Sequence, residues 1–231
     1  MSFSQWVQQL DFSYVIELLL SALAAMVCIS VHESAHGLVA LWLGDQTAKK
    51  QGRISLNPLR HWDLRGFLML AVFHVGWAKP VVIDPRNFRK PKAGMVLTAL
   101  AGPVSNLLLA LVTAIIALIL YMENKLSGAG ENFIYYLFMF FSITTTVSCG
   151  HAVFNLIPIS PLDGSKVLMA VLPEKLYWKL MKVERYGMII LVALVFFGAF
   201  DGFLSTAIGT VSNAIMELAY PLAYQIARLF L

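Results

Sequence analysis

Long apolar runs alternate with short polar segments along the chain. Four runs come close to or exceed the roughly 20 residues that a helix needs to cross a hydrocarbon core about 30 Å thick. They extend over about Phe12–Leu43, Ala93–Met122, Phe133–Leu156 and Val183–Phe200. A fifth run covers Phe203–Leu231. It is interrupted by Glu217, Pro221 and Arg228, so it either spans or lies in the interface. The pattern predicts an α-helical polytopic membrane protein with about four to six transmembrane helices.

Between the first two runs lies a polar insert, Gly44–Lys92, which holds ten of the seventeen basic residues. These are Lys49, Lys50, Arg53, Arg60, Arg65, Lys79, Arg86, Arg89, Lys90 and Lys92. Because cytoplasmic loops carry an excess of Lys and Arg, we expect the insert in the cytoplasm. The turn Glu123–Asn132 has one Lys and two Glu, which suits the outside, and Lys166–Arg185 is basic again. The charge pattern therefore places these three segments inside, outside and inside in turn, as three successive membrane spans require.

The insert is expected to be more than a plain loop. Gln51–Leu56 and Lys79–Ile83 are predicted as short strands, each followed by an Asn-Pro or Asp-Pro turn signal. Phe67–Trp77 is apolar but has only eleven residues, so it is predicted to be re-entrant or interfacial. Backbone of this kind must be covered by protein or line a wet cavity. The insert is therefore predicted to be a small membrane-associated β structure beside a water-filled space.

The composition indicates a chain that is almost entirely membrane domain. Hydrophobic residues make up 59% and charged residues 13%, whereas a soluble domain has about 25% charged residues. We expect a single domain over 1–231, with the insert at 44–92 and C-terminal helices at 183–231. The net charge of +4 reflects topology and attraction to anionic lipid, so we expect the bilayer as a partner and no nucleic acid.

The first apolar run contains the sequence His32-Glu33-Ser34-Ala35-His36. Residues four apart share one face of a helix, so two neutral imidazoles can bind one Zn²⁺ while the Glu between them acts on water. Lone buried histidines are usually packed core residues. Three ionisable side chains on one apolar span are costly, however, and mark a functional site by default. The run therefore predicts a metal site within the bilayer.

A catalytic zinc site needs a third protein ligand, which leaves one position for water. Asp163 follows a stretch in which Pro158 and Pro161 break the third span, and Gly164 permits an unusual backbone turn. Such a broken helix end can bring a carboxylate to a metal. Asp163 could equally cap the next helix, because Asp is a favoured N-cap residue. Three rival ligands also remain open: His61, His74 and His151.

Together, H-E-x-x-H and the later N-x-x-P-x-x-P-L-D-G resemble the motifs of the site-2 protease family. These are intramembrane zinc metalloproteases of the peptidase M50 class, and the likeness is greatest to small bacterial and archaeal members without a PDZ domain. Three other segments resemble sequences of the same group: Gly76–Val81, Asn87–Arg89 and Ala101–Asn106. The resemblance covers about Val27–Val171, and the pairing of the two motifs makes it specific.

The resemblance implies a role for each matching position. His32, His36 and Asp163 would bind one Zn²⁺ per chain, and Glu33 would be the general base. Asn155 would place substrate or stabilise an oxyanion. The role of Asn106, which follows the Gly-Pro element, is left open. Ser160 and His151 depart from the family pattern, since relatives have Pro and an aliphatic residue there.

The resemblance further implies hydrolysis of peptide bonds within or near transmembrane segments. The expected substrates are transmembrane proteins, and the expected location is the cytoplasmic membrane of a prokaryote, with a homo-oligomer left open. One alternative is a metal-binding membrane protein or transporter, although the spans offer few further ligands beyond Glu17, His151 and Glu217. Another is a catalytically inactive relative that acts as a binding partner, which has no need of an intact Glu33.

Overall fold

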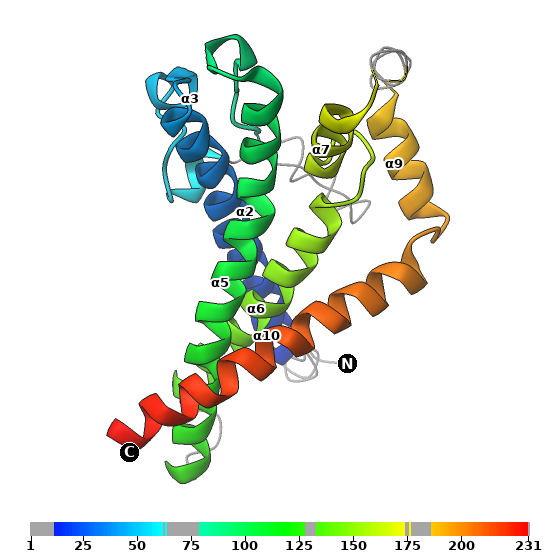
Figure 1. The fold of residues 1–231 in the computed structure, drawn as a ribbon. Helices are drawn as coiled ribbons and strands as arrows, with labels where there is room; N and C mark the ends of the chain where they lie inside the picture. The colour runs from blue at the N-terminus through cyan, green and yellow to red at the C-terminus, as the bar shows by residue number, and fades with distance from the viewer. Residues whose placement is uncertain are drawn as a thin grey trace, which may run out of the picture.

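The computed structural model describes residues 12–61, 63, 79–127, 133–173, 176 and 186–230. Helices account for the regular structure in these residues, and Figure 1 shows their arrangement. In chain order they are α2 (Phe12–Trp42), α3 (Thr47–Lys50), η1 (Pro58–Arg60), η2 (Pro85–Asn87), α5 (Pro91–Ser127), α6 (Phe133–Asn155), α7 (Asp163–Val171), α9 (Gly187–Phe196) and α10 (Asp201–Phe230).

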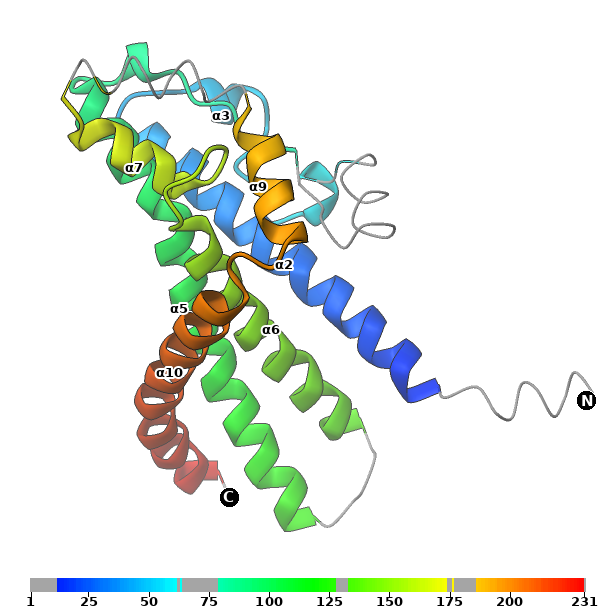
Figure 2. The ribbon, with the colours of Figure 1, turned by 90° about the vertical axis from the view of Figure 1, so that its right-hand side faces the viewer.

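Three long helices, α2, α5 and α6, form the body of the molecule. Their candidate spans, Ser13–Trp42, Pro91–Lys125 and Phe133–Asn155, have 30, 35 and 23 residues, so the first three predicted helices are confirmed. Figures 1 and 2 show α3 and α7 at one end of this bundle, whereas the end of α5 and the start of α6 lie at the other. The start of the insert and the segment after α6 therefore share one side, as the charge pattern predicts.

The predicted fourth span, Val183–Phe200, is not one straight helix. Its described helix, α9, has 10 residues, which are too few to cross a bilayer. Gly198 has a φ of +67°, and its N–H bonds back to the Val195 carbonyl, so a glycine in the left-handed region ends the helix. α10 then continues at 90°. Among the described helices, three qualify as spans, or four if this bent pair counts as one, and four is the lower end of the predicted range.

The last apolar stretch packs against the bundle. In Figure 1, α10 lies across α5 and α6. Ile215 and Ala219 of α10 form a buried cluster with Ala110 and Ala114 of α5 and Cys149 of α6. Small side chains let helix backbones approach closely, which is the usual basis of helix association in a membrane. The C-terminal helix is therefore an integral part of the membrane domain.

The two segments predicted as strands are not strands. No β-strand occurs in the described part of the chain, and both Gln51–Leu56 and Lys79–Ile83 are irregular. Side chains of α2 bind their peptide groups instead: Ser34 Oγ donates to the Ser55 carbonyl at 2.7 Å and accepts from the Ser55 N–H at 3.2 Å. These bonds replace those that a neighbouring strand would supply. The predicted re-entrant segment, Phe67–Trp77, lies outside the described residues.

Asp45 ties the end of α2 to the segment before α5. Its buried carboxylate accepts four hydrogen bonds, from the N–H and hydroxyl of Thr47, the N–H of Asp84 and the side chain of Asn87. Burial alone would raise the pKa of this carboxyl, but the hydrogen bonds outweigh burial and hold the pKa below its ordinary value. An ionised Asp45 thus holds the two ends of the insert together beside the first two membrane helices.

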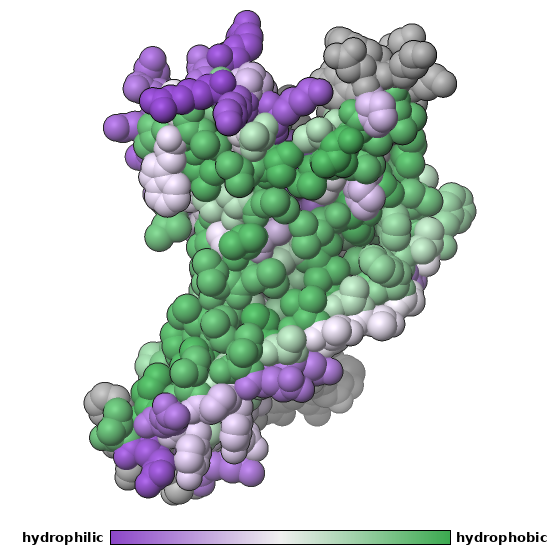
Figure 3. All heavy atoms as spheres, in the orientation of Figure 1, coloured by the Kyte–Doolittle hydropathy of each residue, from purple (hydrophilic) through white to green (hydrophobic). Residues whose placement is uncertain are grey.

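The surface separates into an apolar belt and two polar ends. In Figure 3, hydrophobic residues cover most of the face in view, and hydrophilic residues gather at the end that carries α3 and at the opposite end. Large apolar side chains of α5 are exposed, such as Leu108 at 60% and Val112 at 54%. Exposed apolar area of this kind suits contact with lipid.

Candidate metal centre

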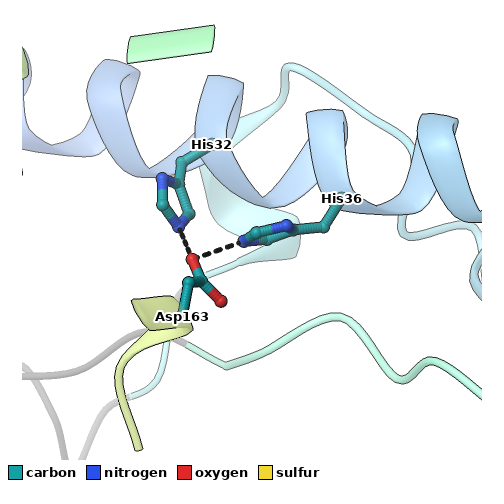
Figure 4. A group of neighbouring side chains, drawn as sticks. All are labelled: His32, His36 and Asp163. Atoms are coloured by element: carbon teal, nitrogen blue, oxygen red, sulfur yellow. Dashed lines mark hydrogen bonds and ion pairs between the residues drawn. The ribbon is translucent and has the colours of Figure 1, made fainter. Parts of the chain in front are cut away.

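Two helices far apart in the sequence bring three candidate ligands together (Figure 4). His32 and His36 lie one turn apart on α2, and Asp163 is the first residue of α7. Both Nε2 atoms lie 3.0 Å from Asp163 Oδ2. The three side chains are buried, with exposed fractions of 3%, 5% and 4%. Among the residues that the structure describes, they form the one cluster of His, Cys, Asp or Glu suited to a metal ion.

The separations within this cluster suit zinc. Zinc bonds of about 2.0–2.1 Å at tetrahedral angles place neighbouring ligand atoms about 3.3 Å apart. The two N–O separations of 3.0 Å are only a few tenths shorter. All three ligand atoms lie within 4.8 Å of one another. Two imidazoles and one carboxylate are also a usual ligand set of catalytic zinc, so the residues present fit the ion.

The hydrogen bonds of His36 suit a neutral metal ligand. Its Nδ1 lies 2.6 Å from the carbonyl oxygen of Thr98 on α5. Because a carbonyl only accepts, Nδ1 carries the hydrogen, and Nε2 of a neutral His36 presents a lone pair. That lone pair faces Asp163 Oδ2, which also only accepts. A metal ion between the two atoms removes this conflict, and Thr98 then fixes the orientation of the ligand ring.

His32 has a comparable partner in Asn106, which is fully buried on α5. The amide nitrogen of Asn106 lies 3.4 Å from His32 Nδ1 and 2.8 Å from His151 Nδ1, whereas Oδ1 has no hydrogen-bond partner. The nitrogen and oxygen of an amide exchange places by a half-turn, and the surrounding partners decide between them. With the oxygen toward the rings, Asn106 accepts from both Nδ1–H groups and leaves His32 Nε2 for a metal. We infer that Asn106 orients the His32 ring.

Asp163 is held through its second oxygen. Lys166 Nζ lies 2.9 Å from Oδ1, which leaves Oδ2 toward the histidines. The alternative that Asp163 caps the next helix is wrong. α7 begins at Asp163 itself, and its capping position is Leu162, which makes no side-chain cap bond.

Gly102 and Gly164 let backbone and ligands approach closely. A Cβ on Gly102 would lie 2.6 Å from His32 Nε2 and 2.6 Å from His36 Cε1, so both imidazoles lie directly against α5. In the sequence, Gly102 stood out only as part of the segment Ala101–Asn106, which resembles the family, and nothing there indicated why a glycine is needed. At Gly164 a Cβ would lie 2.6 Å from the Ile157 carbonyl oxygen. The expected unusual turn is absent, because Gly164 lies within α7 and close approach is what requires the glycine.

The two predicted catalytic residues outside this cluster have partners of their own. Glu33 lies between the two histidines on α2, and its Oε2 accepts a hydrogen bond from the Val81 N–H at 2.8 Å. Asn155 ends α6, and its Nδ2 donates to the His151 carbonyl at 3.0 Å. The Val81 contact places the second half of the insert against the H-E-x-x-H helix.

The rival ligands are not part of the three-residue cluster. His61 is buried in the insert, where its Nε2 lies 2.8 Å from the Ser55 carbonyl oxygen. The ring of His151 lies 4.6 Å from that of His32, centroid to centroid, and contacts Asn106. His74 lies outside the described residues. His151 is therefore a neighbour of the site, in contact with a candidate ligand and with the group that orients it.

Comparisons with known proteins identify the family of the chain. The model of peptidase family M50 matches residues 20–198. The chain is 37% identical over 171 residues to "Putative zinc metalloprotease YwhC" of Bacillus subtilis, a match that covers 73% of this chain and 76% of that protein. It is 25% identical over 189 residues to "Putative zinc metalloprotease Rip2" of Mycolicibacterium smegmatis, with 79% and 69% covered. No solved structure gives a significant match. Since the family model spans most of the sequence, including all three candidate ligands, the chain belongs to peptidase family M50.

Proposed function

We propose that this protein is an intramembrane zinc metalloprotease that cleaves transmembrane proteins within or near their membrane spans. The position of the His32–His36–Asp163 cluster carries the proposal. The cluster is buried among helices that qualify as spans, near the end that carries the basic insert. The candidate spans and the bacterial relatives support a location in the cytoplasmic membrane. Cleavage would then occur nearer the cytoplasmic side.

His32, His36 and Asp163 would hold the ion, oriented by Asn106, Thr98 and Lys166 respectively. When bound there, zinc supplies Lewis acidity that polarises a carbonyl group and acidifies water. Glu33 would take the proton from water and deliver it to the leaving amine. The Val81 N–H binds Oε2 of Glu33, so Oε1 is the oxygen that we assign to this proton transfer.

Asn155 would donate a hydrogen bond to the substrate carbonyl as negative charge develops on its oxygen. Its contact with the His151 carbonyl uses one of the two amide hydrogens and leaves the second for this role. The substrate must present an extended peptide, because the peptide groups of an intact transmembrane helix are bonded to one another. Spans that unwind readily, with Gly, Pro or Asn near the cytoplasmic side, are therefore the expected substrates.

A transporter is less consistent with the geometry. A metal pathway would need several clusters of ligands across the membrane, whereas the described residues form a single one. That cluster is also buried, and α7, which begins at Asp163, lies near one end of the bundle in Figure 1.

Co-expression with single-span reporter proteins tests the proposal. Glu33→Gln should retain about one zinc per chain and lose cleavage by about 10²–10⁴-fold, because it removes the base and keeps the ligands. His32→Ala should lose both zinc and cleavage. Glu17→Gln is the matched control, since Glu17 is an exposed carboxylate on the same helix. Cleavage by Glu33→Gln at the wild-type rate, or full zinc content in His32→Ala, would refute the assignment.

A further inference from the structure

A half-open hollow of about 410 Å³ lies where α2 ends and α5 begins. The last residues of α2 line one wall, the first two turns of α5 line the other, and residues 88–90 close it from the side. None of the three candidate metal ligands lines it. The hollow is therefore a feature distinct from the metal centre.

Two glycines shape this hollow. A Cβ on Gly94 would lie 2.7 Å from Cγ of Phe88, so the buried Phe88 ring fits against the α5 backbone only because Gly94 has no side chain. Gly44, with a φ of +110°, turns the chain away at the end of α2 and leaves the space open. The hollow is thus defined by well-packed residues of the bundle itself.

The hollow carries positive charge without compensation. Arg89 and Lys90 line it, both are exposed, and neither has an ion-pair partner in the described part of the chain. Asp45 lies nearby in sequence but is buried and uses its oxygens for four other hydrogen bonds. Asp84 pairs with Arg86. The first turn of α5 has no acidic residue, so the positive end of that helix adds to the field.

The remaining wall is apolar and faces outward. Trp42 is 73% exposed and Leu97 is 52% exposed, and both line the hollow. Trp42 is the last residue of a candidate span, where tryptophan side chains usually lie at the level of lipid headgroups. In Figure 3 the hydrophilic end above α3 borders directly on the apolar belt. The hollow therefore combines a cationic rim with an apolar wall at the membrane boundary.

We propose that this hollow binds one anionic phospholipid. Arg89 and Lys90 contact its phosphate group, and Trp42 and Leu97 contact the beginning of an acyl chain. The apolar wall is what distinguishes this occupant from free phosphate, which would gain nothing from Trp42 or Leu97. A lipid bound here contacts α2 and α5 together. It would therefore stabilise the packing of these two helices, which carry His36 on α2 and its hydrogen-bond partner Thr98 on α5. Thr98 directly follows Leu97 in the chain.

Native mass spectrometry of the purified protein in detergent tests the proposal, with phosphatidylglycerol as the probe and phosphatidylcholine, which is zwitterionic and has no net charge, as the comparison. The wild type should retain one phosphatidylglycerol per chain. The double variant Arg89→Gln/Lys90→Gln should bind it about 30-fold more weakly, as expected for about 1 kcal/mol per basic residue. Leu97→Gln, which keeps the charge and alters the wall, should also weaken lipid binding. Zinc content reports that each variant is folded.

The matched control is Lys49→Gln/Lys50→Gln, which removes the same charge from α3, also exposed but not lining the hollow. This control should bind phosphatidylglycerol like the wild type. An equal loss in both double variants would mean general attraction of a basic surface and would overturn the proposal. Displacement of the lipid by millimolar inorganic phosphate, or wild-type binding by Leu97→Gln, would also overturn it, since either result makes the apolar wall irrelevant.

Discussion

Gly102→Ala is the most direct test of the metal centre, because it adds one carbon at a known place. The new Cβ would lie 2.6 Å from His32 Nε2 and 2.6 Å from His36 Cε1. Non-bonded contacts of this kind settle at about 3.5 Å or more. One or both rings must therefore move by about 0.9 Å, whereas ligand positions in metal sites tolerate only about 0.2 Å.

The expected result is a loss of zinc affinity of about 10- to 100-fold, comparable to the loss when outer partners of metal ligands are removed. This corresponds to about 1.4–2.7 kcal/mol of binding free energy. Alanine is a better helix former than glycine by about 1 kcal/mol, so α5 itself should not be weakened. Zinc affinity is measured by competition with a chelator, and the melting temperature of the zinc-free protein is recorded beside it.

Two glycine variants serve as controls. At Gly150 on α6 a Cβ would lie 3.7 Å from its nearest neighbour, and at Gly209 on α10 it would have no neighbour within 4 Å. Both Gly→Ala changes should leave zinc affinity unchanged. Wild-type affinity in Gly102→Ala would show that the imidazoles do not lie against α5. An equal loss in Gly150→Ala would show that any added methyl group disturbs the bundle.

Two further predictions concern the groups that hold the site and the insert. Lys166→Met should lower zinc affinity about tenfold, because it removes the contact that holds Asp163 Oδ1. Lys166→Arg, which keeps the positive charge, should retain most of the wild-type affinity. Equal zinc affinities in the wild type and both variants would show that Lys166 has no positioning role. The folded protein lowers the pKa of Asp45, so its stabilisation is full above the unfolded pKa of about 3.9 and is lost as pH falls through the folded pKa. Thermal unfolding in detergent should show the wild type to be more stable than Asp45→Asn by about 2 kcal/mol at pH 7. This difference in stability should disappear below about pH 4. A difference that does not change with pH would contradict the ionised state of Asp45.

Features that depend on residues close together in the chain could be predicted from the sequence alone. Apolar runs longer than a bilayer predicted α2, α5 and α6, because helix formation and hydrophobic length are local properties. The four-residue spacing of His32 and His36 placed both on one face of α2 for the same reason. The partner of these histidines was harder to predict. Asp163 was identified by its motif, while its use as a helix cap stayed open until the start of α7 was known.

Features that depend on which helices lie side by side could not be predicted from the sequence. The two segments of the insert that were predicted as strands are irregular, because Ser34 and Glu33 of α2 bind their peptide groups. Nothing in the sequence of those segments indicates these partners. The need for Gly102 arises only where α5 crosses the two imidazoles. Likewise Asn106 meets His32 across 74 residues of chain. Such contacts follow from the packing of distant surfaces, so local patterns of polarity and spacing carry no record of them.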